Sequence, residues 1–188
     1  MAQHVCPWWL GYLLLNPVRS WMHNPEKLLA PYVREGMTVL EPGPGMGFFT
    51  LPLARRTGPA GRVVTVDIQP RMLESLRRRA LKAGLLERVE TRLAEPNSMG
   101  IDDLKGKVDI VWAFYMVHEL PSEEAFFGEA VAALKPGGLL LLAEPVGHVK
   151  PVKFQHELEA AQAAGFEVTD RPAIRRSLAA VLRKKGQG

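Results

Sequence analysis

The sequence has very little cysteine, since Cys6 is the only one among 188 residues. An internal disulfide, a Cys-x-x-Cys redox pair and a cysteine-rich zinc site are therefore excluded, and a cytoplasmic location is predicted. Long apolar runs are scarce as well: the run over residues 8–15 is far shorter than the roughly 20 residues that span a bilayer. No basic segment precedes it, as a signal peptide would require. Insertion into a membrane is not expected, whereas contact with a membrane surface stays open.

The net charge is modest, +4 with an isoelectric point near 9.4. Much of the excess lies within one expected helix, in Arg71, Arg77, Arg78, Arg79 and Lys82. A solvated helix face explains this cluster better than a surface that binds RNA. With 188 residues, of which 47% are apolar, the chain can bury one substantial core. We therefore expect one compact unit over residues 37–188, preceded by a helical cap segment over residues 1–36.

From residue 38 onward, β-branched runs alternate with amphipathic stretches, which predicts an α/β fold with helices on both faces of a sheet. Parallel strands are expected at 38–41, 62–67, 88–93, 108–114 and 138–144. Helices are expected at 47–57, 70–83, 122–135 and 151–164, with a short, irregular crossover around 95–105. The segments 166–171 and 177–184 can form a terminal antiparallel hairpin. The prediction is a seven-stranded, mostly parallel, Rossmann-like sheet.

Three details of these elements can be checked. The helix after the first strand is expected to begin between Met46 and Phe48, with Pro52 tolerated in its first turn or so. Ser122 is expected to cap the next-to-last helix, whose apolar stripe includes Leu134. The two N-terminal helices are expected to break around Asn24-Pro25, and the segment with Trp8 and Trp9 can pack on the sheet, cover the acceptor pocket or form a membrane or dimer surface.

The most informative motif is Glu41-Pro-Gly43-Pro-Gly45-Met-Gly47, which follows the first strand. Glycines permit both a sharp strand-to-helix turn and the close approach of a cofactor to the main chain. The spacing is Gly-x-Gly-x-Gly, whereas a dinucleotide loop would place its third glycine at position 48. Asp67 ends the second strand 20 residues after Gly47, a spacing at which a carboxylate reaches ribose hydroxyls. Alternatively, Asp67 caps the helix that begins at Pro70.

A second group of polar residues follows the fourth and fifth strands, at the sheet edge where ligands of open α/β folds bind. His118 is the first candidate for a general base, and Glu144 and His148 are expected to lie near it. The alternative role for His118 is a hydrogen bond to the main chain that shapes the pocket floor. A metal site built from the two histidines with Glu119 and Glu144 is the less favoured interpretation, because no helical spacing fixes the ligands. No metal is therefore predicted.

Taken together, the glycine motif, Asp67 after a valine-rich strand, Val117-His118-Glu119-Leu120 and Leu134-Lys135-Pro136-Gly137-Gly138 resemble class I S-adenosylmethionine-dependent methyltransferases. The likeness covers about residues 25–184 and is strongest to the small type-11 group, which includes the quinone-biosynthesis methyltransferases. It implies a cofactor pocket at the first, second and fourth strands. Two departures are Glu41, where aspartate is usual, and Ala94-Glu95-Pro96, which replaces a Gly-Asp-Ala-type turn.

The resemblance also implies roles for single residues. Glu41, Gly43, Gly45 and Gly47 would surround the methionine part of the cofactor, and Asp67 would bind its ribose. Ala113 and Phe114 would lie beside the sulfonium. Ile68 and Met72 would flank the adenine, and Glu95 takes the place of the acid that meets the adenine amine.

The predicted activity is transfer of a methyl group from S-adenosylmethionine to a small acceptor that can be apolar, with S-adenosylhomocysteine as product. A cofactor-binding regulatory or scaffold protein without turnover is one alternative. An RNA methyltransferase is another, suggested by the basic isoelectric point, but the sequence has no appended RNA-binding module. The sequence gives no indication of the oligomeric state.

Overall fold

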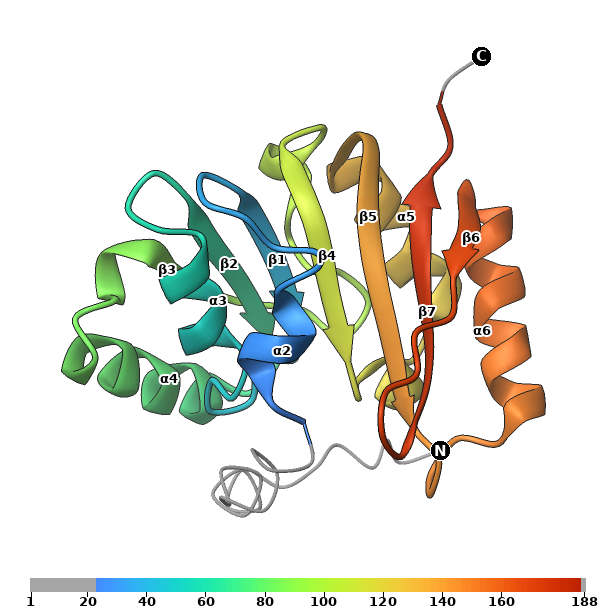
Figure 1. Ribbon diagram of the computed structural model, residues 1–188, viewed down its shortest axis with the longest axis horizontal. Coiled ribbons are helices and arrows are strands. Elements are labelled where there is room, and N and C mark those ends of the chain that lie inside the picture. Colours follow the sequence, from blue (N-terminus) through green and yellow to red (C-terminus); the bar gives the residue numbers. More distant parts are fainter. Residues whose placement is uncertain (1–22, 187–188) are drawn as a thin grey trace. The chain divides into compact units, whose positions relative to one another are not determined.

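A computed structural model describes residues 23–186 of the chain, which divides into two compact units, one ending at Ala94 and one beginning at Glu95. Both units contain strands and helices (Figure 1). The segment with Trp8 and Trp9, and the helix expected there, lie outside the described residues. A single unit over residues 37–188 stays a prediction.

The first unit is built on three parallel strands in the order β3-β2-β1. Val63, Val64 and Val66 of the central strand are buried, which matches the β-branched run in the sequence. The strands of this unit are β1 (Thr38–Pro42), β2 (Arg62–Asp67) and β3 (Val89–Leu93). Its helices are α2 (Pro25–Leu29), α3 (Thr50–Arg56), α4 (Pro70–Lys82) and the 3-10 turn η2 (Leu86–Arg88).

In the second unit, the strands follow the order β4-β5-β7-β6. The first two are parallel, and β7 runs antiparallel to both of its neighbours. The strands are β4 (Val108–Phe114), β5 (Leu134–Pro145), β6 (Phe166–Asp170) and β7 (Ser177–Lys184). The helices are α5 (Glu123–Ala133), α6 (Pro151–Ala163) and the 3-10 turns η3 (Asp102–Leu104) and η4 (Val117–Glu119). Helix α5 packs against α6 and β5, and α6 packs against β6 (Figure 1).

Two predicted element boundaries were wrong. Helix α3 begins at Thr50 rather than between Met46 and Phe48, because the left-handed main chain of Gly47 (φ +87°) cannot belong to a right-handed helix. Helix α5 ends at Ala133, so Leu134 is not part of its apolar stripe. Instead, Leu134 begins β5 and pairs with Val108. Strand β5 therefore starts four residues before the predicted position 138.

The other details agree with the sequence. Pro52 is the third residue of α3, in its first turn, and the side chain of Ser122 accepts a hydrogen bond from the main-chain N–H of Ala125, 3.1 Å away. Asn24 caps α2 directly before Pro25; the helix expected before this point lies outside the described residues, so the break between two helices stays a prediction. The predicted class, a seven-stranded and mostly parallel α/β fold with a terminal antiparallel hairpin, is confirmed for the described residues.

Between residues 23 and 186, none of the helices combines the length and apolar character needed to cross a bilayer.

Candidate functional site

The glycine motif forms a loop between β1 and α3 in the first unit. Gly43, Gly45 and Gly47 all have left-handed φ angles, of +65°, +54° and +87°. Residues with a Cβ rarely adopt this conformation, so the alternate glycines are needed for the path of the loop itself. A Cβ built on Gly45 would meet no atom within 4 Å. The loop therefore exposes main chain at Gly45, as close contact with a bound ligand requires.

Glu41, at the end of β1, connects the strand to the helix after the loop. Its side chain is almost fully buried, and its Oε2 accepts a hydrogen bond of 2.6 Å from the hydroxyl of Thr50, the first residue of α3. A buried carboxylate needs such a partner to compensate for lost hydration. The predicted acid before the glycines is thus a structural link between the two ends of the loop. Its contact with the methionine part of a cofactor stays a prediction.

Helix α4 holds the same loop from the side. A Cβ on Gly47 would lie 2.5 Å from Cδ1 of Leu76, so the helix packs directly against this glycine. The guanidinium of Arg79 donates a hydrogen bond to the main-chain carbonyl of Met46, and partial burial lowers the pKa of Arg79. The interpretation of Arg79 as part of a solvated basic face was therefore wrong. The sequence did contain a sign of this contact: Arg79 lies three residues after the apolar Leu76, and residues at this spacing share a helix face.

Asp67 lies at the end of β2, as predicted. Its Oδ1 accepts a hydrogen bond of 2.8 Å from the main-chain N–H of Gln69, the residue that precedes α4. The alternative that Asp67 caps α4 was wrong, because the N-cap is Gln69 and the helix start has no side-chain cap hydrogen bond. The carboxylate of Asp67 instead orders the turn before the helix, and its binding of a ribose stays a prediction. Of the two residues expected beside the adenine, Ile68 is 41% exposed and Met72 is buried in α4.

In the second unit, His118 and Glu144 form a hydrogen-bonded pair. Nδ1 of His118, in η4, bonds to Oε2 of Glu144, near the end of β5. The other carboxylate oxygen, Oε1, accepts a 2.9 Å hydrogen bond from the main-chain N–H of Val117. Because Glu144 is fully buried, both of its oxygens need these partners. His118 therefore bonds to a carboxylate rather than to the main chain, and the alternative of a main-chain partner was wrong.

This pair determines which nitrogen of His118 can act as a base. A carboxylate only accepts hydrogen bonds, so Nδ1 carries the proton and Nε2 keeps its lone pair. Nε2 lies 3.9 Å from Oε1 of Glu119, and the His118 side chain is 19% exposed. Burial lowers the pKa of His118, but the hydrogen bond and charge of Glu144 outweigh it, so the pKa is raised above its ordinary value.

The other candidates of this unit lie in different environments. The ring of His148 is stacked on that of His118 at a centroid distance of 6.0 Å, which brings the predicted histidines together. Ala113 and Phe114 are buried at the end of β4. Glu95 is exposed, and its main chain forms an isolated antiparallel β-bridge with that of Ser98. Within residues 23–186, no group of three or more metal-ligating side chains is placed to hold an ion.

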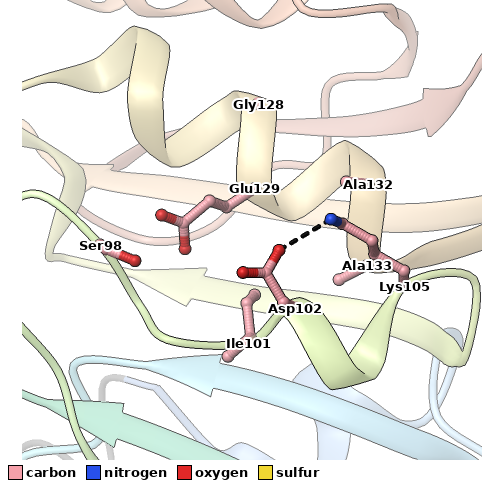
Figure 2. Close-up of a pocket in the computed structure, with 8 residues that line it drawn as sticks. All are labelled: Ser98, Ile101, Asp102, Lys105, Gly128, Glu129, Ala132 and Ala133. Atoms are coloured by element: carbon pink, nitrogen blue, oxygen red, sulfur yellow. Dashed lines mark ion pairs between the residues drawn. The ribbon is translucent and has the colours of Figure 1, made fainter.

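A small cavity of about 160 Å³ lies between α5 and the crossover that contains η3 (Figure 2). Its charged groups are compensated locally: Lys105 pairs with Asp102 at 2.8 Å, and Glu129 accepts a hydrogen bond from the N–H of Met99. None of the predicted site residues contributes to it. Its lining residues are Ser98, Ile101, Asp102, Lys105, Gly128, Glu129, Ala132 and Ala133.

The comparison with protein families identifies the class. Residues 39–138, more than half of the chain, match the family model described as methyltransferase domain. The chain therefore belongs to this family, and the predicted class of S-adenosylmethionine-dependent methyltransferases is confirmed. S-Adenosylmethionine is the cofactor that this class implies.

Two curated proteins are similar to parts of this chain. The chain is 32% identical over 123 residues to an arsenite methyltransferase of Halobacterium salinarum, covering 65% of this chain and 30% of that protein. It is 29% identical over 126 residues to the ubiquinone/menaquinone biosynthesis C-methyltransferase UbiE of Brucella suis, covering 67% and 46%. The match to UbiE agrees with the predicted resemblance to quinone-biosynthesis methyltransferases. The chain spans less than half the length of these curated relatives.

A solved structure matches nearly the whole chain. The structure of a SAM-dependent methyltransferase from Aquifex aeolicus has a TM-score of 0.84 and 25% identity, covering 95% of this chain and 98% of that one. The glycine loop of the present chain fits such a cofactor, because its left-handed glycines leave main chain exposed and Gly45 has open space beside it. Gly43, Gly45 and Gly47 are the residues expected to lie against the methionine part, with Asp67 at the ribose.

Proposed function

We propose that this chain catalyses S-adenosylmethionine-dependent methylation of a small molecule whose acceptor atom must lose a proton, such as a hydroxylated aromatic ring. The observation that carries this proposal is the His118–Glu144 hydrogen bond, with Glu144 fully buried. A regulatory protein that only binds the cofactor has no need for a histidine oriented by a buried carboxylate. The names of relatives, which include a ubiquinone biosynthesis O-methyltransferase, agree with an acceptor of this class.

When bound, S-adenosylmethionine supplies an activated methyl group on a sulfonium. The chain then has to orient the acceptor, exclude water and remove a proton, and positioning alone can contribute much of the acceleration. In this proposal Nε2 of His118 takes the acceptor proton. Glu144 holds the ring through Nδ1 and stabilises the imidazolium that forms. The ring of His148 stacks on that of His118, so in this proposal His148 also lies beside the acceptor.

The pH dependence of this base follows from its pKa. Only neutral His118 can accept a proton, and Glu144 raises the pKa of His118. Methyl transfer should therefore increase with pH, and the rise should be centred above the ordinary histidine value of about 6.5. In the variant His118→Gln this rise should be absent.

The test compares His118→Gln with His156→Gln, which changes an exposed histidine on α6. Methyl incorporation into a panel of hydroquinones, catechols and phenols is measured by mass spectrometry, and cofactor binding by calorimetry. His118→Gln should bind S-adenosylmethionine like the wild type but lose about 100-fold or more in turnover. His156→Gln should behave like the wild type in both assays.

Two outcomes would contradict the proposal. Equal turnover of His118→Gln and the wild type would remove His118 from the role of base. Tight cofactor binding with no methylation of any acceptor in the panel would favour the regulatory or scaffold alternative.

A further inference from the structure

The second unit buries an acidic side chain that the proposed chemistry does not use. Glu157 lies in α6 within the buried stripe of Phe154, Leu158 and Ala161, where an apolar residue would satisfy packing. Its side chain is fully buried, and neither carboxyl oxygen has a hydrogen-bond partner among the described residues. An ionised carboxylate in such a place loses its hydration without compensation. Glu157 is therefore expected to be protonated at neutral pH.

The charged groups around Glu157 come from four elements. They are Glu144 of β5, Glu123 of α5, Lys153 of α6 and His118 of η4. Lys153 forms an ion pair with Glu123, so its charge is already compensated. The remaining neighbours are the two members of the hydrogen-bonded pair, Glu144 and His118. Burial, followed by the charge of Glu144, raises the pKa of Glu157 to about 8.

Resting on the function proposed above, we propose that Glu157 is a positioning residue for His118: its buried carboxyl group, next to the Glu144–His118 pair, sets how tightly Nε2 of His118 holds a proton. It acts through charge and not by touching the acceptor. While Glu157 is neutral, the carboxylates that favour the imidazolium of His118 are Glu144, which bonds to Nδ1, and Glu119, which lies 3.9 Å from Nε2. Once Glu157 ionises, a further negative charge favours the imidazolium.

The coupling is reciprocal. Protonation of His118 places a positive charge near Glu157 and lowers the pKa of Glu157, and ionisation of Glu157 raises the pKa of His118 to the same extent in free energy. The two groups therefore titrate as a pair.

The test follows the imidazole signal of His118 by NMR between about pH 5 and pH 10, in the absence of cofactor and acceptor, a range that includes the pKa of Glu157 at about 8. His118→Gln identifies the signal, which is practical because the chain has only five histidines. In the wild type the signal should change in two steps, the upper one near the pKa of Glu157. Glu157→Gln should abolish the upper step and lower the midpoint of His118 by about half a pH unit, a threefold change in proton affinity.

Glu159→Gln is the matched control, because Glu159 is an exposed glutamate on the same helix. It should give a titration identical to that of the wild type. A purely structural Glu157 would also leave the His118 titration unchanged after substitution by glutamine. Identical titrations of the wild type and folded Glu157→Gln would therefore overturn the proposal.

A second measurement keeps the proposal testable if Glu157→Gln does not fold. The carboxyl carbon of Glu157 is titrated in the wild type and in His118→Gln. Its pKa should be higher in His118→Gln, because the imidazolium no longer favours the carboxylate, and an unchanged pKa would contradict the coupling.

These titrations require no turnover, so they separate this inference from the proposed function. If no acceptor is methylated and the coupling is still observed, only the methyl-transfer proposal fails. If methylation depends on His118 and the coupling is absent, only the role of Glu157 fails.

Discussion

At the scale of single residues, two glycines of the loop, Gly45 and Gly47, have different reasons to be glycine. Gly45 and Gly47 both have left-handed main chains, a conformation that costs a residue with a Cβ about 1–2 kcal/mol. Only Gly47 also lacks space, because Leu76 lies where a Cβ would be and is itself fully buried. The space beside Gly45 is open. Gly47 is thus required by packing, whereas Gly45 is suited to contact with a ligand.

This difference leads to a prediction for two alanine variants. Gly47→Ala should lower the free energy of unfolding more than Gly45→Ala, because it adds a steric conflict to the conformational cost. Gly45→Ala should weaken S-adenosylmethionine binding by about tenfold or more, or 1.4 kcal/mol. Denaturant unfolding and calorimetry measure the two quantities. Equal losses of stability, or unchanged cofactor affinity of Gly45→Ala, would contradict the assignment.

The sequence predicts candidate site residues near the ends of strands better than it predicts those on helix faces. The glycines, Asp67 and His118 could be proposed as candidates because they lie at or shortly after the carboxyl ends of strands with strong β-branched or apolar character. Arg79, Thr50 and Glu157 could not be assigned, because their roles depend on which helix face meets the loop or the strands. Glu157 did leave a trace in the sequence, an acidic residue in the apolar stripe of α6.

At the scale of elements, α4 supports the glycine loop in addition to covering the strands. Leu76 contacts Gly47, and Arg79 bonds to the carbonyl of Met46 within the loop. The loop thus has a fixed path that does not depend on α3 alone. Helix α3 has only seven residues and no side-chain cap at its start, so support from α4 is needed.

We therefore predict that Arg79→Met weakens S-adenosylmethionine binding. Loss of a hydrogen bond from a charged group costs about 1.5–3 kcal/mol of stability. Because this bond fixes the loop, we expect part of that cost to appear as an affinity for S-adenosylmethionine that is about tenfold lower. Arg78→Met is the control, because Arg78 is exposed and pairs with Glu74 on the same helix. Calorimetry should give wild-type affinity for the control. Equal affinities of both variants would show that the loop does not depend on Arg79.

The element boundaries that were wrong share a physical cause. The glycine loop extends to Phe49, and helix α3 starts late, because the alternate glycines up to Gly47 have left-handed main chains. Leu134 has the spacing of a helix stripe, but pairing with Val108 places it in β5. In both cases the side-chain pattern suggests a longer helix than the main chain forms. Left-handed glycines delay the start of α3, and strand pairing ends α5 before Leu134. Strands bounded by clear turn signals, such as β2 and β7, were predicted at their exact limits.

At the scale of the whole molecule, the charge distribution no longer indicates RNA binding by itself. Of the positive charges of α4, Arg79 bonds to a main-chain carbonyl of the loop, whereas the exposed Arg78 pairs with Glu74 on the surface of the same helix. The fold class could be predicted in full because the α/β alternation runs through residues 38–184. The acceptor could not, because its recognition depends on side chains that do not form a motif in the sequence.

The central claim is that the glycine loop and Asp67 bind S-adenosylmethionine. The most direct test is calorimetric titration of S-adenosylmethionine and S-adenosylhomocysteine into the wild type, Asp67→Ala and Asp170→Ala. Asp170 is a suitable control because, like Asp67, it accepts a hydrogen bond from a nearby main-chain N–H. We predict micromolar binding of both compounds to the wild type and the control, and at least about tenfold weaker binding to Asp67→Ala. No binding to the wild type, or equal affinity for all three proteins, would contradict the account.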